Sequence, residues 1–373
     1  MVHYPCKFWQ KMRCVIIHIL YVTTIGMTMG FFKQFIQQLT NQGHRIDIAC
    51  NDTDSPVPSF YQEIGCCVHT INCTRSPFHP GSITAIRQLR ALVKRERYDI
   101  VHCHTPVAAF CTRLACINLP CRVIYTAHGF HFYKGSPLKN WLLFYPAEKV
   151  CAHFTDLLIT INKEDYALAQ RRLKAKKVVY IPGVGIDLAA FSPNQKGFSR
   201  EELDIPQGNR VLLSVGELSH RKNHELLIRA ASDIPNTTVL IAGAGKLDAY
   251  LKALAQELSC DVRFLGYRKD IAALCTACDV FVLPSFQEGL PVALMEAMAC
   301  AKAVSCSAIR GNVDLVDPEG GTLFDPANVE SCRTALQKVL SGDLTAMGQH
   351  NRQVLDAFSI EAVNQEMLSL YTQ

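Results

Sequence analysis

The chain has 373 residues, of which 49% are hydrophobic and 19% are charged. This is enough apolar sequence for two globular domains with cores of their own, and it argues against a disordered chain. The 17 cysteines are an odd number in a chain too large to need covalent cross-links, so we interpret them as reduced thiols rather than the disulfides of a small secreted protein.

Charge is distributed unevenly along the chain. Residues 1–185 contain 22 Lys/Arg and 10 Asp/Glu, whereas residues 186–373 contain 16 and 23. A basic first half predicts an anionic partner, which could be a phospholipid surface, a lipid diphosphate or nucleic acid. Nucleic acid is disfavoured, because the basic runs at 87–97 and 171–177 come without a recognition helix or RNA-binding aromatic residues. Solvated helix faces explain the same runs equally well.

The N-terminal segment resembles a signal anchor. Residues 14–32 contain no Asp, Glu, Lys or Arg and follow three basic residues. Polar and glycine residues dilute this stretch, however, and its order favours a strand at Val15 to Leu20, a Thr/Gly turn and a helix ending near Gly43. We therefore predict a Rossmann-like strand, helix and strand here rather than a transmembrane helix.

Short apolar runs then alternate with helical patterns in both halves, which predicts an α/β fold with two doubly wound parallel sheets. The further predicted strands are Ile46 to Cys50, Ile100 to His102, Val123 to Thr126, Leu157 to Ile161, Val178 to Ile181, Val211 to Val215, Thr238 to Ala242, Val262 to Leu265, Val280 to Leu283 and Ala303 to Ser305. A Pro/Gly-rich crossover places the domain boundary near Gly183. Such sheets bind ligands at the carboxyl ends of their strands, so we expect the site in a deep cleft between two facing domains.

The segment from Pro284 to Val304 carries the strongest chemical signal. Glu288 and Gly289 lie in a loop after a predicted strand, and Glu296 lies about two turns into the Ala/Met-rich helix that follows. The N–H groups and positive dipole at the helix start suit a diphosphate, and the two carboxylates suit sugar or ribose hydroxyls. A solvated helix face is the alternative, but the apolar neighbours of Glu296 would make an unpaired charge costly. The segment therefore indicates a nucleotide-sugar site.

Together with this segment, four other stretches resemble glycosyltransferase family 4, the retaining enzymes of GT-B fold, and specifically its exopolysaccharide and capsule branch. The matching stretches are TAHGFHFYKGSPLKNW (126–141), TINKEDYALA (160–169), VGELSHRKNHELLI (215–228) and RGNVDL (310–315). The resemblance covers nearly the whole chain. It implies the GT-B fold, with two facing Rossmann-like domains at residues 1–183 and 184–357 and a last helix at 358–373 that crosses back to the first domain.

The resemblance also implies catalytic roles for three residues. His128, after the strand VIYTAH, would lie beside the donor sugar and the reaction centre. Lys222 would neutralise the diphosphate as charge grows on it in the transition state. Glu288 would orient the sugar ring. A front-face path would then retain the anomeric configuration without the carboxylate nucleophile that double displacement requires.

A second group of residues is expected to bind the donor. Glu296 would hold the nucleotide ribose, and the other donor-binding candidates are Gly216, Arg221, Tyr267, Arg268, Gly289 and Leu290. One position departs from the family pattern, because Glu217 occupies a place where many members have arginine. Arg221 is the candidate to replace that charge.

Residues of the first half are expected on the acceptor or diphosphate side, namely Gly26, Gly30, His131, Tyr133 and Lys134. An exposed loop and amphipathic helix would explain Tyr133 and Lys134 as well. The helix LKNWLLFYPAEKV could also form an interfacial membrane face through its Trp141, Leu142, Phe144 and Tyr145 side chains, with Lys139 and Lys149 beside them.

We expect no metal and no cofactor, since Lys222 and a helix dipole would handle the leaving-group charge and no DxD pair is evident. Cys275 and Cys278 form a single CxxC without a second pair, which an apolar helix explains better than zinc or redox chemistry. His102 and His104 alternate on a strand with Cys103 between them, and one such pair does not chelate a metal easily.

The expected function is transfer of a sugar from a nucleotide donor, preferably a UDP-sugar, to a saccharide carried on polyprenyl diphosphate. The protein would be a hexosyl- or N-acetylhexosaminyltransferase of surface glycan synthesis, cytoplasmic and peripheral at the inner face of the plasma membrane. Two alternatives stay open, a nucleotide-sugar epimerase of similar fold and a non-catalytic membrane-bound scaffold. A nicotinamide oxidoreductase is disfavoured, because no GxGxxG follows a strand.

Overall fold

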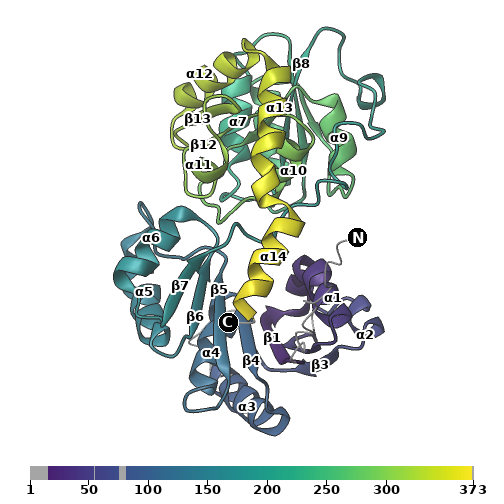
Figure 1. Cartoon of the computed structure of the whole chain (residues 1–373). Coiled ribbons are helices and arrows are strands. Elements are labelled where there is room, and N and C mark those ends of the chain that lie inside the picture. Colours follow the sequence, from purple (N-terminus) through teal and green to yellow (C-terminus); the bar gives the residue numbers. More distant parts are fainter. Residues whose placement is uncertain (1–15, 54, 75–80, 372–373) are drawn as a thin grey trace, which may run out of the picture. The chain divides into compact units, whose positions relative to one another are not determined.

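The computed structural model describes residues 16–53, 55–74 and 81–371. Its contacts divide the chain into two units. The first unit comprises Met1–Thr126 with Val150–Leu157, and the second comprises Ala127–Lys149 with Leu158–Gln373. Figure 1 shows the elements of each unit in the colours of the sequence.

The first sheet has the strand order β3-β2-β1-β4-β5-β6-β7. Its strands are β1 (His18–Ile25), β2 (Arg45–Asn51), β3 (Cys67–Thr70), β4 (Ile100–His104), β5 (Arg122–Ala127), β6 (Leu157–Thr160) and β7 (Lys177–Tyr180). The strand β1 pairs in parallel with both β2 and β4, so the strand order reverses at this point. The helices of this part of the chain are η1 (Gly26–Phe32), α1 (Lys33–Asn41), α2 (Phe60–Glu63), α3 (Gly81–Glu96), α4 (Pro106–Ala115), α5 (Leu138–Ala152) and α6 (Lys163–Arg172).

The second sheet lies wholly within the second unit and has the order β10-β9-β8-β11-β12-β13. Its strands are β8 (Arg210–Val215), β9 (Thr237–Ala242), β10 (Val262–Phe264), β11 (Val280–Leu283), β12 (Ala303–Ser307) and β13 (Gly321–Phe324). The helices are η2 (Glu201–Leu203), α7 (His224–Ala231), α8 (Asp248–Glu257), α9 (Ile271–Ala277), α10 (Val292–Ala299), α11 (Asn312–Leu315), α12 (Val329–Leu340), α13 (Leu344–Val354), η3 (Leu355–Phe358) and α14 (Ile360–Tyr371). The predicted class of two parallel α/β domains of GT-B type is confirmed.

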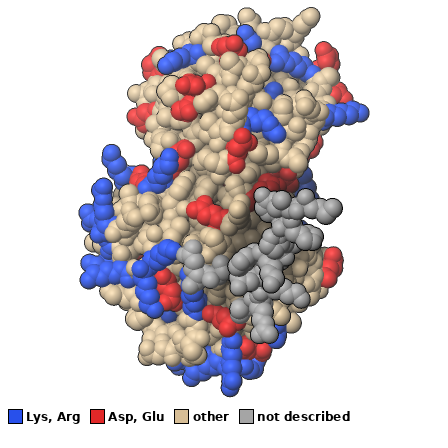
Figure 2. Space-filling view, viewed as in Figure 1, with Lys and Arg blue, Asp and Glu red and all other residues tan. Residues whose placement is uncertain are grey.

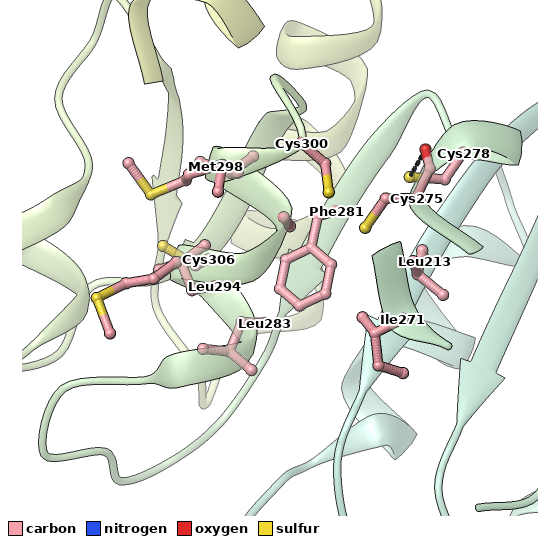
Figure 3. Packing of buried hydrophobic residues seen from close by; sticks show 14 of the residues in the cluster. Leu213, Ile271, Cys275, Cys278, Phe281, Leu283, Leu294, Met298, Cys300 and Cys306 are labelled. Carbon is pink, nitrogen blue, oxygen red and sulfur yellow. Dashed lines mark hydrogen bonds between the residues drawn. The ribbon is translucent and has the colours of Figure 1, made fainter. Parts of the chain in front are cut away.

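The second sheet is covered on both faces, which explains why its strands are apolar throughout. In β11, Phe281 and Leu283 belong to one buried cluster, and Val280 and Val282 belong to another. The first cluster also contains Leu294 and the other buried residues of α10, and Figure 3 shows Leu294 and Phe281 among its side chains. Helix α10 is therefore anchored in the core, with its first residue, Val292, shortly after the carboxyl end of β11.

The cysteines of the predicted CxxC lie in this same core. Cys275 and Cys278 are almost fully buried, and the Cys278 thiol donates to the Cys275 carbonyl at 3.4 Å (Figure 3). The apolar helix interpretation accounts for both side chains.

The first strand differs from the prediction. Strand β1 continues to Ile25, through residues that the sequence analysis assigned to a Thr/Gly turn, and the turn begins only at Gly26. Val and Thr are good strand formers, and pairing with β2 and β4 favours the longer strand. Residues 14 and 15 lie outside the described residues. Within the described part, no helix is both long and apolar enough to cross a membrane.

Candidate functional site

The site forms where neighbouring strands of the second sheet end. Gly216 follows β8, Gly243 follows β9 and Gly266 follows β10. The Gly216 N–H donates to Ala242 at 3.0 Å, and the Gly243 N–H donates to Gly266 at 2.7 Å. Hydrogen bonds thus hold these loops together at the carboxyl edge of the sheet, where parallel α/β proteins bind ligands.

Lys222 and Glu288 form the charged centre of this edge. The Lys222 Nζ lies 2.7 Å from Glu288 Oε1, and Arg221 lies 3.5 Å from Glu288 Oε2. Lys222 and Glu288 are largely buried, whereas Arg221 is exposed. The Phe286 N–H donates to the Arg221 carbonyl at 2.9 Å, which fastens the two loops side by side. Two cations therefore converge on one carboxylate.

Gly216 shapes this centre by leaving room for Lys222. A Cβ atom at Gly216 would lie 3.0 Å from the Lys222 Cδ atom and 3.1 Å from its Cε atom. The glycine lets the aliphatic part of Lys222 lie directly on the backbone after β8. Glu217, the next residue, is exposed, and as an acid it supplies no positive charge to this centre.

Helix α10 follows the loop that contains Glu288. Its N-cap is Pro291, as the Gly-Leu-Pro sequence predicted, and Val292 is its first residue. The first N–H groups of a helix have no intrahelical partner, and they carry the positive end of its dipole. A helix start and cations are groups that suit an anionic ligand.

Glu296 lies within α10 among buried neighbours. Burial raises the pKa of its carboxyl to about 7. No hydrogen bond or ion pair of this carboxyl is found among the described residues. The oxygens of this half-buried carboxyl are therefore suited to accept hydrogen bonds from the hydroxyl groups of a ligand.

The backbone around His128 packs directly on the Glu288 loop, within the second unit. A Cβ atom at Gly289 would lie 2.1 Å from the His128 carbonyl oxygen, so only glycine fits there. Gly129 has a φ of +123° and lies against both Gly289 and Arg310. Burial lowers the pKa of the His128 imidazole to about 4, which keeps the ring neutral at physiological pH. The structure thus brings His128, Glu288 and Lys222 into one neighbourhood.

Arg310 holds this neighbourhood together. Its guanidinium lies 2.7 Å from Asp165 Oδ1 and donates to the carbonyls of Phe130, at 2.7 Å, and Glu288, at 3.1 Å. It also stacks over the Tyr133 ring, 4.2 Å from the centroid. Both members of the Arg310–Asp165 pair are buried. Arg310 therefore connects the loop after β5 to the loop after β11.

Asp165 is fixed in turn by its own partners. The Phe130 N–H donates to its carboxylate at 3.0 Å and the Asn162 amide donates to it at 2.9 Å. Burial raises the pKa of Asp165, against the opposing attraction of Arg310. The sequence analysis quoted the stretches that contain Arg310 and Asp165 but gave neither residue a role. The presence of a charged residue in each of these stretches is the sequence signal that could have identified Arg310 and Asp165.

The acceptor-side candidates near β5 have structural partners. The His131 ring packs against Phe144 with a centroid distance of 4.6 Å, and burial lowers the pKa of His131. Tyr133 lies under Arg310, and the Lys134 N–H donates to Glu164 at 2.9 Å. The Lys134 side chain is exposed.

The remaining donor-binding candidates lie around the same edge. Tyr267 is 74% exposed, directly after Gly266. Arg268 pairs with Asp270 at 2.8 Å and lies over the Phe198 ring, so its charge is already engaged. The Leu290 side chain is buried in the core.

Gly26 and Gly30 lie in the first unit, in η1. A Cβ atom at Gly26 would lie 2.3 Å from the Ser55 carbonyl oxygen, so the backbone passes too closely for any larger residue. Gly30 has open space around it. In the described ranges, no group of three or more His, Cys, Asp or Glu residues could hold a metal ion.

Two family models match the chain in succession. The model for Glycosyltransferase Family 4 matches residues 31–190, and the model for Glycosyl transferases group 1 matches residues 195–354. The α/β domains and the models that match them define the chain as a glycosyltransferase. With the relatives that follow, they show that it belongs to glycosyltransferase family 4.

Relatives of similar length support this assignment. EpsD of Bacillus subtilis (strain 168), which is named as a glycosyltransferase, is 34% identical over 92% of this chain and 92% of its own length. The UDP-Gal:alpha-D-GlcNAc-diphosphoundecaprenol alpha-1,3-galactosyltransferase of Escherichia coli is 28% identical over 95% of this chain and 96% of its own.

Solved structures share the fold at low sequence identity. Sucrose-phosphate synthase from Thermosynechococcus elongatus has a TM-score of 0.79 and 21% identity, with 95% of this chain and 98% of that chain covered. Anabaena HepE in complex with UDP and glucose has a TM-score of 0.77 and 19% identity, with 95% and 99% covered.

Proposed function

We propose that this glycosyltransferase moves a hexosyl or N-acetylhexosaminyl group from a UDP-sugar to a saccharide carried on polyprenyl diphosphate, with retention of anomeric configuration. The observation that carries the proposal is the convergence of Lys222 and Arg221 on Glu288 beside the start of α10. Cations next to a helix N-terminus suit a diphosphate, and the carboxylate suits sugar hydroxyls.

Lys222 stabilises the leaving group in this mechanism. One of its three N–H donors is engaged by Glu288, so the others are available to a phosphate oxygen. Negative charge on the diphosphate grows as the glycosidic bond breaks, and a fixed cation stabilises that charge more in the transition state than in the ground state. No divalent metal is required for this step.

The transfer itself follows a front-face path. The bond from the anomeric carbon to the phosphate oxygen breaks, and a bond from that carbon to the acceptor oxygen forms on the same face. The acceptor proton passes to the departing phosphate oxygen. Glu288 orients the sugar ring, and neutral His128 lies beside the donor sugar, where it accepts or donates one hydrogen bond without adding charge.

The nucleotide is held through its ribose by Glu296. An ionised carboxylate accepts two hydroxyl donors, and burial strengthens such hydrogen bonds. UDP is the preferred nucleotide, because the named Escherichia coli relative uses UDP-Gal and the Anabaena neighbour was solved with UDP.

The acceptor proposal rests on the basic first half of the chain and on the same relative, which acts on a diphosphoundecaprenol-linked sugar. Gly26, Gly30, His131, Tyr133 and Lys134 are the candidates for that side. A lipid-linked acceptor places the enzyme at the cytoplasmic face of the plasma membrane, in exopolysaccharide or capsule synthesis.

The test is turnover by the purified full-length chain with a panel of UDP- and GDP-sugars and a polyprenyl-diphosphate-linked sugar, in the presence of EDTA. Released nucleotide and lipid product are measured for the wild type and for Lys222→Ala. We expect acceptor-dependent release that the substitution abolishes, and NMR of the product to show the anomeric configuration of the donor.

Other results would point elsewhere. Conversion of the donor to an epimer without acceptor would make the protein an epimerase. Vesicle binding without turnover or nucleotide-sugar binding would make it a scaffold. Turnover that EDTA stops and Mg²⁺ restores would refute the metal-independent mechanism.

A further inference from the structure

The outer face of α5 exposes apolar side chains that the fold does not use. Leu138 and Leu142 are each 72% exposed, and Leu143 is 46% exposed. Leu138 and Leu142 are four residues apart and share one side of the helix, and the exposed Leu143 directly follows Leu142, so the three leucines form an apolar strip on the exposed part of α5. Single exposed leucines are ordinary on a protein surface, but an apolar strip rimmed by charge marks an interaction site.

The aromatic residues of α5 attach the helix to the domain. The Trp141 and Tyr145 rings lie 5.6 and 5.4 Å from the Phe132 ring, and the Trp141 indole donates to the Tyr133 carbonyl at 3.3 Å. Phe144 packs on His131. The sequence analysis placed these aromatic residues on the membrane face, together with Leu142. The structure corrects that placement, because the three aromatic side chains are partly buried and only Leu142 of this set is exposed.

The surroundings of the leucine strip are basic. Residues 130–180 contain nine Lys/Arg and four Asp/Glu. Of the four acids, Asp165 is paired with Arg310 and Glu148 is buried, so they add little negative charge to the surface. Lys139 and Lys149 are exposed on α5 itself. Figure 2 shows Lys and Arg gathered on the flank that carries α5 and α6 in Figure 1.

We propose that the outer face of α5, formed by Leu138, Leu142 and Leu143 with Lys139 and Lys149, docks on an anionic phospholipid bilayer. The leucines enter the boundary between headgroups and acyl chains, and the lysines extend to the lipid phosphates. The inference deepens the proposed function, since a lipid-linked acceptor is presented at such a surface. Helix α5 is attached to the loop at 130–133, so docking holds that loop near the bilayer.

The test measures partition of the full-length chain onto vesicles of phosphatidylcholine, with and without phosphatidylglycerol, in the absence of any nucleotide sugar. We expect binding that needs the anionic lipid and weakens with salt. The double variant Leu138→Ser with Leu142→Ser should bind about 10- to 100-fold more weakly, because it removes the CH₂ groups that would be buried in the bilayer. Lys139→Glu with Lys149→Glu should remove the preference for phosphatidylglycerol.

A matched control is Ile83→Ser, which changes a 57% exposed apolar residue on the basic helix α3. It should bind vesicles like the wild type. Unchanged thermal unfolding of the serine variants would show that the fold is intact, as expected for exposed positions.

Three outcomes would overturn the proposal. The first is wild-type vesicle binding by the double serine variant, and the second is an equal loss in Ile83→Ser. The third is a loss of self-association instead of vesicle binding, since a second copy of the chain would then cover the strip. Turnover with a short-chain, water-soluble acceptor separates this proposal from the proposed function. This turnover should be unchanged in the double serine variant. If the wild type shows no turnover, the proposed function is refuted, and the vesicle experiment still decides whether α5 is a docking surface.

Discussion

Replacing Arg310 by methionine should destabilise the second unit severely. The substitution keeps an apolar chain of similar length but leaves Asp165 as a buried carboxylate without its cation. Removing one partner of a buried ion pair costs about 3–5 kcal/mol. The carbonyls of Phe130 and Glu288 also lose a donor, at about 1 kcal/mol each. The expected total of about 5–7 kcal/mol is comparable to the whole stability of many proteins, which is about 5–15 kcal/mol.

Arg310→Lys is the graded companion variant. Lysine keeps a cation for Asp165 but lacks the planar fork that reaches both carbonyls, so we expect a loss of about 2 kcal/mol. Arg310→Met combined with Asp165→Asn removes both charges and should lose much less than the two single variants added together.

The loss should also depend on pH. Burial already raises the pKa of Asp165, and without Arg310 the pKa must rise further. A carboxyl whose pKa is higher in the folded state destabilises the fold as pH rises through that pKa. The deficit of Arg310→Met should therefore be larger at pH 8 than at pH 5, because a raised pKa makes Asp165 bind a proton more readily at the lower pH.

Urea unfolding followed by Trp141 fluorescence measures these effects. The chain has two tryptophans, so a Trp9→Phe background leaves Trp141, whose indole is bonded to Tyr133 below Arg310, as the reporter. The reasoning is refuted if Arg310→Met unfolds within about 1 kcal/mol of the wild type, or if its deficit is the same at pH 5 and pH 8.

Three further predictions concern catalysis and binding. Lys222→Ala should lower kcat by about 10²- to 10³-fold in initial-rate assays, because it removes a preorganised cation, and a loss below tenfold would contradict its role. UDP affinity measured by calorimetry should rise as pH increases through about 7, because the Glu296 carboxyl loses its proton there and can accept from both ribose hydroxyls. Glu296→Gln should abolish that dependence, and a persisting pH effect would assign it to another group. Gly216→Ala should lower kcat about tenfold or more without unfolding the protein, because the added Cβ would lie 3.0 Å from Lys222 Cδ and displace the lysine side chain. Wild-type turnover by this variant would show that catalysis does not depend on this position of Lys222.

Much of the fold followed from local pattern. The apolar runs of the second sheet were predicted within a residue or two, because strands buried on both faces are apolar throughout. Strands β3 and β13 were missed. Strand β3 has no fully buried residue, and β13 begins with glycine, so neither shows the apolar run that predicts a strand. Their pairing with β2 and β12 places them in the sheets.

The charged centre of the site was also accessible from the sequence. Lys222, Glu288 and Glu296 lie in segments whose strand, loop and helix order is visible locally, and the structure brings Lys222 and Glu288 to 2.7 Å. Their chemical roles remain predictions.

The sequence by itself determined the parallel α/β class, the position of the helix that begins after Glu288, and the residue types that can meet a diphosphate there. Each of these depends on neighbours within a few positions of the chain. Only the tertiary structure decided that Arg310 pairs with Asp165, because the two residues are 145 positions apart and nothing local specifies their contact. It also decided which side of α5 faces outward. The apolar residues of that helix are spread around it rather than gathered on one side, so periodicity could not choose a side, and the choice was made by packing of its aromatic residues on Phe132.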